Sequence, residues 1–249
     1  MEIGEKKLQC LSGSTLKLIA MASMLIDHTA AFFLLYARPL YHHGTEAFPH
    51  AELVYQVMRQ IGRTAFPIFC FLLVEGFYHT SDRFRYLARL MVFALLSELP
   101  FDLATQGRIV GWKYQNVFFT LCLGMGMMML LSVVADAPKT ENGQRMMPAL
   151  RLVLCACICL FFLWAAEAIR CDYGSRGILL ILILYWLRPY RALACAAGYV
   201  SFLWEAFCFP AFLLIPLYNG KRGIRLKYVF YAFYPVHILL LYFLKTRVF

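Results

Sequence analysis

The sequence predicts an all-α, polytopic membrane protein with about eight or nine membrane segments. Of 249 residues, 62% are hydrophobic and 15% are charged, and the mean hydropathy is +0.65. Soluble domains carry about 25% charged residues, and a soluble chain of this length has too little interior to hide so much apolar surface. The excess is expected to face lipid. Apolar runs of membrane-helix length recur along the chain, so residues 1–249 are treated as one domain.

The apolar runs give the expected membrane segments in order. They cover residues 16–36, 61–78, 87–103, 116–134, 148–168, 177–187 and 228–244. Pro67 is expected to kink the second segment and Pro100 to lie near the end of the third, because proline interrupts helical hydrogen bonding. The run 192–218 is ambiguous, since Pro210 and Pro216 favour a pair of short segments or a re-entrant hairpin.

Polar and basic stretches separate these runs. A basic loop is expected over residues 82–89, a linker-like loop over 136–144 and a second basic loop over 221–227. The net charge of +10 lies in such clusters and not along one solvated face, so lipids are the expected partner and nucleic acid is not. Positive charges favour the cytoplasmic side, which places the N-terminus and both basic loops there. That orientation favours nine segments, with eight as the alternative.

Three ionisable residues lie in the first segment, where each is costly. Lys17 and His28 are eleven residues apart, which places them on one helix face and about 16 Å apart along the axis. A cation at the membrane edge can hold phosphate while the deeper imidazole acts as a base. The alternative is that Lys17 snorkels and His28 makes one interhelical hydrogen bond. Asp27 diverges from His28 and is expected to pair with another helix.

Further polar residues predict a polar interior. An ion-pair lattice, Asp27 with Arg63 and Glu75 with Arg89, would explain several of them without chemistry. Asn116 has the position of a helix N-cap. The other buried or segment-end candidates are Arg59, His79, Glu98, Asp102, Gln115, Asp172, Tyr173, Glu205 and His237.

No metal is expected. The nine cysteines form no CxxC pair, and no HExxH, GxSxG or nucleotide-binding glycine loop is present. His42, His43 and His50 with Glu46 are interpreted as a solvated loop, with a metal site as the alternative.

Ordered motifs give the chain a family resemblance. They are LKLIA at 16–20, MLIDH at 24–28, IGRTAFPIF at 61–69, EGF at 75–77, SELPFD at 97–102, QNVFFTL at 115–121, DYG at 172–174, YNGKRG at 218–223, FY at 230–231 and YPVH at 234–237. With these, the chain resembles the TraX family, which is associated with N-terminal acetylation of conjugative pilin. It is also similar to transmembrane acyltransferases of the acyltransferase-3 kind. Their first segment carries a basic residue, ten intervening residues and a histidine, a spacing that Lys17 and His28 match.

The resemblance implies a membrane-bound acetyltransferase of the bacterial cytoplasmic (inner) membrane. It would transfer acetyl from cytoplasmic acetyl-CoA to an amine or hydroxyl of a peptide or envelope acceptor, such as a pilin-like N-terminus. The expected catalytic residues are His28, Asp27, Glu75, Arg63 and Asn116. The expected donor-binding residues are Lys17, Arg59, Arg85, Lys221 and Arg222. The expected acceptor-binding residues are Glu98, Asp102, Gln115, Asp172, Tyr173 and His237.

A second hypothesis is a proton-coupled small-molecule transporter. Asp27, His28, Glu75 and His237 would then form a proton relay. The sequence has no inverted repeat, which transporters often have, and a relay does not need the Lys17–His28 register. A non-catalytic scaffold would leave the buried acids and histidines unexplained.

Overall fold

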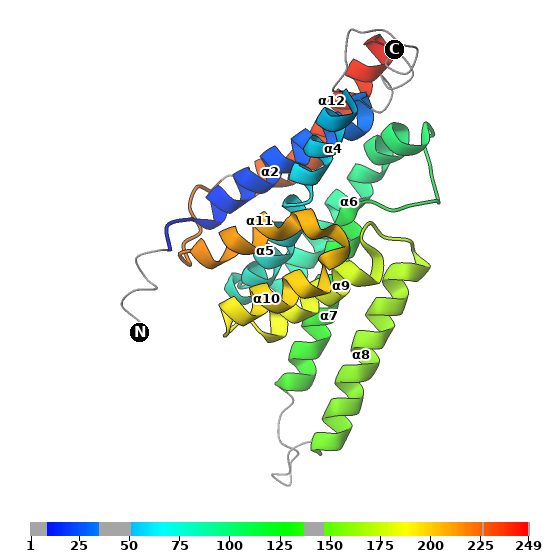
Figure 1. The fold of residues 1–249 in the computed structure, drawn as a ribbon. Helices are drawn as coiled ribbons and strands as arrows, with labels where there is room; N and C mark the ends of the chain where they lie inside the picture. Colours follow the sequence, from blue (N-terminus) through cyan, green and yellow to red (C-terminus); the bar gives the residue numbers. More distant parts are fainter. Residues whose placement is uncertain (1–8, 35–50, 137–146, 226, 249) are drawn as a thin grey trace.

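The computed structural model describes residues 9–34, 51–136, 147–225 and 227–248, and these fold into a bundle of helices (Figure 1). Over these residues no strand forms, and β-type pairing is limited to two isolated bridges. The predicted all-α fold is confirmed. The loop histidines His42, His43 and His50 lie outside the described residues.

The first predicted segment is correct. Helix α2 spans Gly13–Thr29 and continues into a π-helix, η1, over Ala30–Leu34. The Ser12 side chain caps α2 by accepting a hydrogen bond from the Thr15 backbone N–H at 3.2 Å. Short π-helical stretches often occur at functional sites, and η1 begins two residues after His28.

The second predicted segment, 61–78, corresponds to α5 over Ala65–His79, and a further helix that was not predicted, α4 over Ala51–Gly62, precedes it. The chain breaks at Arg63 and Thr64, one turn before Pro67, so the predicted interruption of this segment by Pro67 is confirmed. Pro67 has no N–H to bond the Arg63 carbonyl, and its ring would clash there. The helix therefore stops before residue 63, and Pro67 lies in the first turn of α5.

Helix α6 spans Arg83–Gln106, so the predicted basic loop is wrong. Asp82 caps α6 through the Arg85 N–H at 2.8 Å, which places the arginines in helical turns. Pro100 lies inside the helix and does not end it. The end comes at Gly107, whose φ of +64° is easily adopted by glycine.

The other predicted segments match helices α7 over Val117–Ala135, α8 over Pro148–Ala168, α9 over Gly174–Trp186 and α12 over Lys227–Val248. The ambiguous run divides into α10, Arg191–Ser201, η2, Leu203–Cys208, α11, Phe209–Leu214, and η3, Ile215–Leu217. Its main break is at Glu205, which has non-helical backbone angles. Pro210 and Pro216 stand in the first turns of short pieces, where no N–H is needed.

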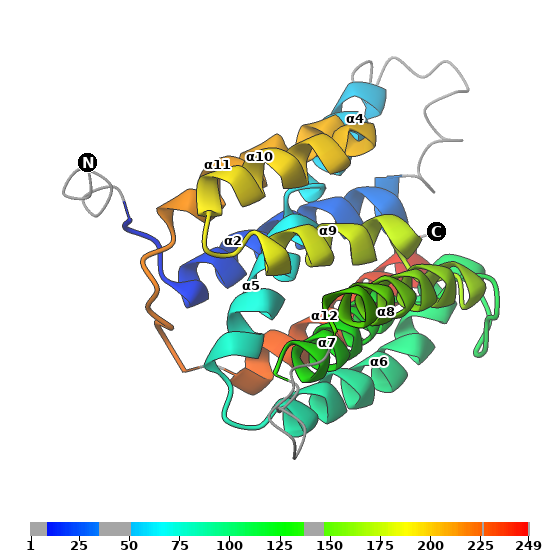
Figure 2. The ribbon, with the colours of Figure 1, turned by 90° about the horizontal axis from the view of Figure 1, so that it is seen from below.

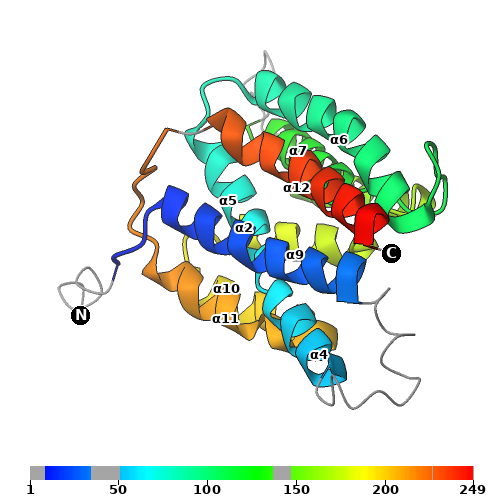
Figure 3. The same ribbon diagram turned by 90° about the horizontal axis from the view of Figure 1, so that it is seen from above.

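Helix α5 occupies the centre of the bundle, where it packs on α2, α7, α9 and α11. Helices α2 and α12 run side by side, and α6 and α7 lie beyond α12 (Figure 3). Helix α8 lies at the edge of the bundle (Figure 1), and the view from below shows it next to α7 and α9 (Figure 2). The end of the bundle at which α2 and α12 begin and α5 ends is called the Lys17 end below.

The surface agrees with a membrane protein. Among the described residues, four helical stretches are long and apolar enough to cross a membrane, over 52–79 (α4 and α5 together), 117–135, 148–168 and 228–247. Helix α8 buries only Cys159, Phe162 and Ala166, and its exposed side chains include Leu152, Leu160 and Trp164. Such an apolar surface is stable against lipid. The number of crossings, eight or nine, stays a prediction.

Candidate active site

The loop after η3 is hydrogen-bonded to the first turn of α2. The Gly13 N–H donates to the Lys221 carbonyl at 2.8 Å, and the Ser14 N–H donates to the Arg222 carbonyl at 3.0 Å. These bonds satisfy two of the donors that a helix start leaves free. Gly223 has a φ of +74°, and a Cβ there would collide with the Ser14 hydroxyl. The loop therefore holds Arg222 beside the start of α2.

A cavity of about 490 Å³ begins at this loop and runs between α2, α5, α6, α7 and α12. Its apolar wall includes Phe69, Leu72, Leu73, Phe118 and Leu121. Its polar lining residues include Ser14, Lys17, Glu75, His79, Tyr86, Arg89, Tyr218, Arg222, Tyr231 and Tyr234. The cavity is polar at the Lys17 end and mainly apolar further in, and volumes of about 300–1,000 Å³ are usual for small-molecule sites.

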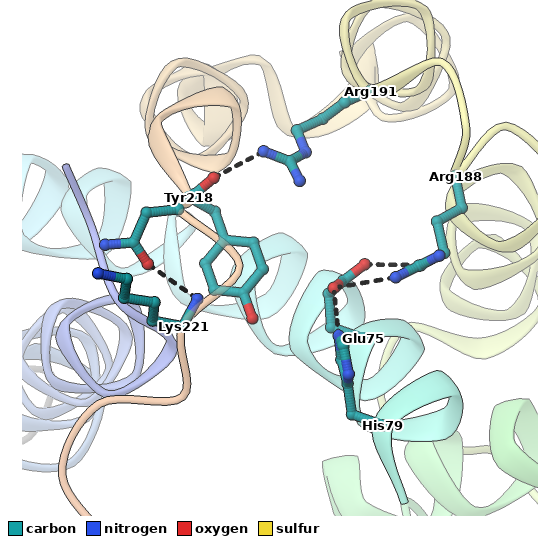
Figure 4. Close-up of polar contacts among 7 residues, drawn as sticks. Glu75, His79, Arg188, Arg191, Tyr218 and Lys221 are labelled. Atoms are coloured by element: carbon teal, nitrogen blue, oxygen red, sulfur yellow. Dashed lines mark hydrogen bonds and ion pairs between the residues drawn. The ribbon is translucent and has the colours of Figure 1, made fainter. Parts of the chain in front are cut away.

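Among the described residues, Glu75 is the one carboxylate in the cavity lining, and its charge is neutralised. Arg188, just after α9, donates to its oxygens at 2.8 and 3.3 Å, and His79 Nε2 is 3.4 Å away (Figure 4). The predicted Glu75–Arg89 pair is therefore wrong. Arg191 bonds the Tyr218 carbonyl at 2.7 Å nearby (Figure 4).

Three cations line the cavity without such a partner. In the part of the chain that the structure describes, Lys17, Arg89 and Arg222 make no ion pair with a carboxylate. Lys17 Nζ lies 5.1 Å from the Phe230 ring centroid, and Arg89 Nε is buried without a hydrogen-bond partner. We call these three residues the cation cluster. Unpaired cations in a partly enclosed space are costly, so an anionic ligand would be stabilised there.

Two histidines lie next to the cavity lining, although neither is part of it. Tyr234 lines the cavity, and its ring centroid is 6.0 Å from that of His28 and 5.8 Å from that of His237. His28 Nδ1 and His237 Nε2 are 2.7 Å apart, although 209 residues separate them in sequence. His28 is half-buried, whereas His237 is 4% exposed. A half-buried imidazole therefore lies directly behind Tyr234 in the wall of a cavity that Lys17, Arg89 and Arg222 also line.

The charged residues beside His28 form ion pairs outside the cavity lining. Asp27 pairs with Arg59 of α4 at 2.8 Å, and Arg63 pairs with Glu205 of η2 at 3.0 Å. The prediction that Asp27 pairs with another helix is confirmed, but the predicted partner Arg63 is wrong. Gly62 permits the close approach of α4 to α2, because a Cβ at this position would overlap the Asp27 side chain.

The polar residues around the start of α7 bond one another. Asn116 caps α7 through the Phe118 N–H at 3.0 Å, as predicted, and its amide donates to the Ala94 carbonyl at 2.8 Å and to Glu98. Asp102 accepts from Gln106 at 2.9 Å and from the Gly111 N–H at 2.6 Å. Both amide hydrogens of Asn116 are engaged, so an oxyanion would have to displace one of these bonds.

The residues around the start of α9 lie at the end of the bundle opposite the Lys17 end. The Gln115 carbonyl accepts from the Asp172 N–H at 2.9 Å, and Asp172 is exposed. Tyr173 has a φ of +65° and stacks on Phe66 with centroids 3.7 Å apart. None of these residues lines the cavity.

Of the predicted donor-binding residues, the structure brings Lys17 and Arg222 together. Arg59 is bound to Asp27, Arg85 is 76% exposed and pairs with Asp82 at 3.3 Å, and Lys221 does not line the cavity. Sequence reasoning gave no site role to the lining residues Arg89, Tyr231 and Tyr234. The three-residue spacing of Tyr231, Tyr234 and His237 on one helix face was the available signal.

The four residues of the alternative proton relay do not meet. Only His28 and His237 are in contact, since Asp27 is bound to Arg59 and Glu75 to Arg188. The arrangement gives no continuous path of proton carriers through these four side chains.

Two comparisons with known proteins found matches over most of the chain. A family model described as TraX protein matches residues 12–245. The chain is 30% identical over 260 residues to a probable fimbrial assembly protein FimC, serogroup H1, from Dichelobacter nodosus, covering 92% of this chain and 94% of that protein. No solved structure matches. The similarity to acyltransferases of the acyltransferase-3 kind stays a prediction.

Proposed function

Since the chain belongs to the TraX family, we propose that it is a membrane-bound acetyltransferase that uses acetyl-CoA to acetylate a pilin- or fimbria-related acceptor. The observation that carries the proposal is the cavity, which begins at an unpaired cation cluster and ends beside His28. The cavity lining changes from polar at the Lys17 end to mainly apolar further in, and an anionic donor with a long, less polar arm matches this change.

The cation cluster would bind the donor's phosphates. Lys17 supplies a point charge, and the guanidinium groups of Arg89 and Arg222 supply forked donors that match phosphate oxygens. Glu75 would not repel the phosphates, because Arg188 neutralises it. The thioester arm would follow the apolar wall toward Tyr234. Lys17 and His28 lie about 16 Å apart along α2, so the donor's charged and reactive ends would occupy opposite ends of the cavity.

His28 would act as the general base. It takes a proton from the acceptor amine or hydroxyl, whose nitrogen or oxygen attacks the thioester carbonyl carbon. The carbon–sulfur bond then breaks, and protonated His28 returns the proton to the leaving thiolate. The product is an amide or ester plus free CoA thiol. Enclosure within the bundle would limit hydrolysis of the thioester.

The acceptor is proposed from the relative's name, a fimbrial assembly protein. Pilin-like peptides carry an N-terminal amine, which is a suitable nucleophile once it is neutral. With the N-terminus in the cytoplasm of a bacterial inner membrane, the Lys17 end would face the compartment that supplies acetyl-CoA. The acceptor would approach His28 from the opposite side, where Asp172 and Tyr173 lie.

The test is release of CoA thiol by protein in nanodiscs supplied with acetyl-CoA and a synthetic pilin N-terminal peptide. His28→Gln should lower the rate about 10²- to 10⁴-fold, the range for loss of a general base. It should keep acetyl-CoA binding and thermal stability near wild type, because Gln retains a polar side chain. Wild-type protein that neither binds acetyl-CoA nor releases thiol would refute the proposal.

A further inference from the structure

We propose that His237 is a positioning residue that fixes His28 in the tautomer whose free lone pair is on Nε2. The catalytic consequence rests on the proposed function, whereas the tautomer itself does not. The inference depends on the direction of two hydrogen bonds and on the exposure of the two rings.

The contact between the histidines is a well-aligned hydrogen bond. Their ring planes differ by 5°, and their centroids are 4.9 Å apart, while Nδ1 and Nε2 are separated by 2.7 Å. The centroid separation exceeds the nitrogen separation by about two ring radii. Both nitrogens therefore lie close to the line that joins the centroids, and the bond lies near the plane of both rings, where the nitrogen lone pair points.

The second bond of His237 sets the direction of the first. His237 Nδ1 is 2.6 Å from the Phe233 carbonyl oxygen. A carbonyl can only accept, so Nδ1 of His237 carries the hydrogen. In a neutral imidazole the other nitrogen is then an acceptor, so His237 Nε2 accepts from His28. His28 must therefore carry its hydrogen on Nδ1, and its lone pair is on Nε2.

Exposure separates the roles of the two rings. Both nitrogens of His237 are engaged and the residue is 4% exposed, so it cannot take a proton from a substrate without breaking a bond. His28 is half-buried and has one nitrogen outside these bonds. His28 is the base, and His237 acts through it.

Neighbouring rings keep the pair aligned. Phe233 lies against His237 with centroids 4.5 Å apart, and Phe32 of η1 lies 5.3 Å from His28. When His28 gains a proton on Nε2, its Nδ1–H remains bonded to His237, and that bond becomes charge-assisted and stronger. His237 thus supports the imidazolium without exchanging a proton with the substrate.

The structural test is nitrogen NMR of ¹⁵N-histidine-labelled protein in nanodiscs, with His28 assigned by its loss in His28→Gln. Protonated and unprotonated ring nitrogens resonate in separate ranges. Wild type should show His28 with hydrogen on Nδ1 only. His237→Leu, which removes the acceptor, should give a mixture of tautomers. His28 with hydrogen on Nε2 in wild type, or an unchanged spectrum in His237→Leu, would overturn the proposal.

The kinetic test separates positioning from packing. His237→Leu should lower kcat for thiol release about 10- to 100-fold, less than the ~10⁴-fold known for a carboxylate partner, and leave the KM for acetyl-CoA near wild type. His237→Gln, whose amide oxygen can accept from His28, should recover most of the rate. Val236→Leu, on the exposed face of α12, serves as the control and should match wild type.

Equal losses in His237→Gln and His237→Leu would overturn the positioning role. Absence of turnover in wild type would instead refute the proposed function, and the NMR result would still decide the tautomer.

Discussion

Arg89 offers a direct way to test whether the cavity binds an anion. Its Nε is buried without a hydrogen-bond partner, and its guanidinium contacts Tyr86 and Tyr231 without a neutralising carboxylate among the described residues. A bond between a cation and a charged acceptor contributes about 1.5–3 kcal/mol. Arg89→Gln should therefore weaken acetyl-CoA binding about 10- to 100-fold.

Arg85 is the matched control. It lies on the same helix one turn earlier, but it is 76% exposed and already paired with Asp82. An exposed charge of this kind contributes less than about 1 kcal/mol, so Arg85→Gln should change the dissociation constant by less than about fivefold.

The assay is equilibrium binding in nanodiscs, with acetyl-CoA and with phosphate-free pantetheine as ligands. Only the phosphate-bearing ligand should lose affinity in Arg89→Gln, because the arginine is assigned to phosphate and not to the arm. Equal binding of acetyl-CoA by the Arg89 and Arg85 variants would refute the assignment, as would a parallel loss for pantetheine.

Four further substitutions, one of them a control, test the arrangement around the cavity. Glu75→Leu leaves Arg188 without its partner and should lower the free energy of unfolding by about 2–3 kcal/mol. This is somewhat below the range for a fully buried pair, because Arg188 is 34% exposed. Thermal unfolding in detergent measures the loss, and an unchanged midpoint would contradict the prediction. Gly223→Ala should weaken acetyl-CoA binding and lower stability, because its Cβ meets Ser14 and pushes the Arg222 loop from α2. Gly220→Ala has a similar φ of +75° with nothing within 4 Å and should show only the left-handed strain of about 1–2 kcal/mol; equal binding defects would rule out the clash. Gly62→Ala should force α2 from α4 and destabilise the fold by about 1–3 kcal/mol, and wild-type thermal stability would argue against that contact.

The sequence was most informative about helices. Apolar length alone predicted α7, α8 and α12 to within a few residues, because lipid exposure requires such runs. The interruption by Pro67 was predicted, but its position at residues 63–64 was not, because the effect of a proline falls on the carbonyl four residues earlier. Pro100 was expected to end α6, but the helix continues to Gly107.

The sequence predicted several residues of the site, but it did not predict which of them are in contact. His28 and His237 both stood out as intramembrane imidazoles, yet their contact joins the first and last helices. Glu75 was assigned Arg89 from the nearby chain, whereas its partner Arg188 is 113 residues away. Such pairs depend on how helices pack, and local periodicity carries no information about that.

The most direct measurement of the central claim is simultaneous detection of free CoA thiol and of acetylated pilin N-terminal peptide, by mass spectrometry, with wild type and His28→Gln in nanodiscs. The account predicts equal amounts of both products in wild type and neither above background in the variant, with acetyl-CoA still bound. Acetylated peptide formed at the wild-type rate by His28→Gln would contradict it.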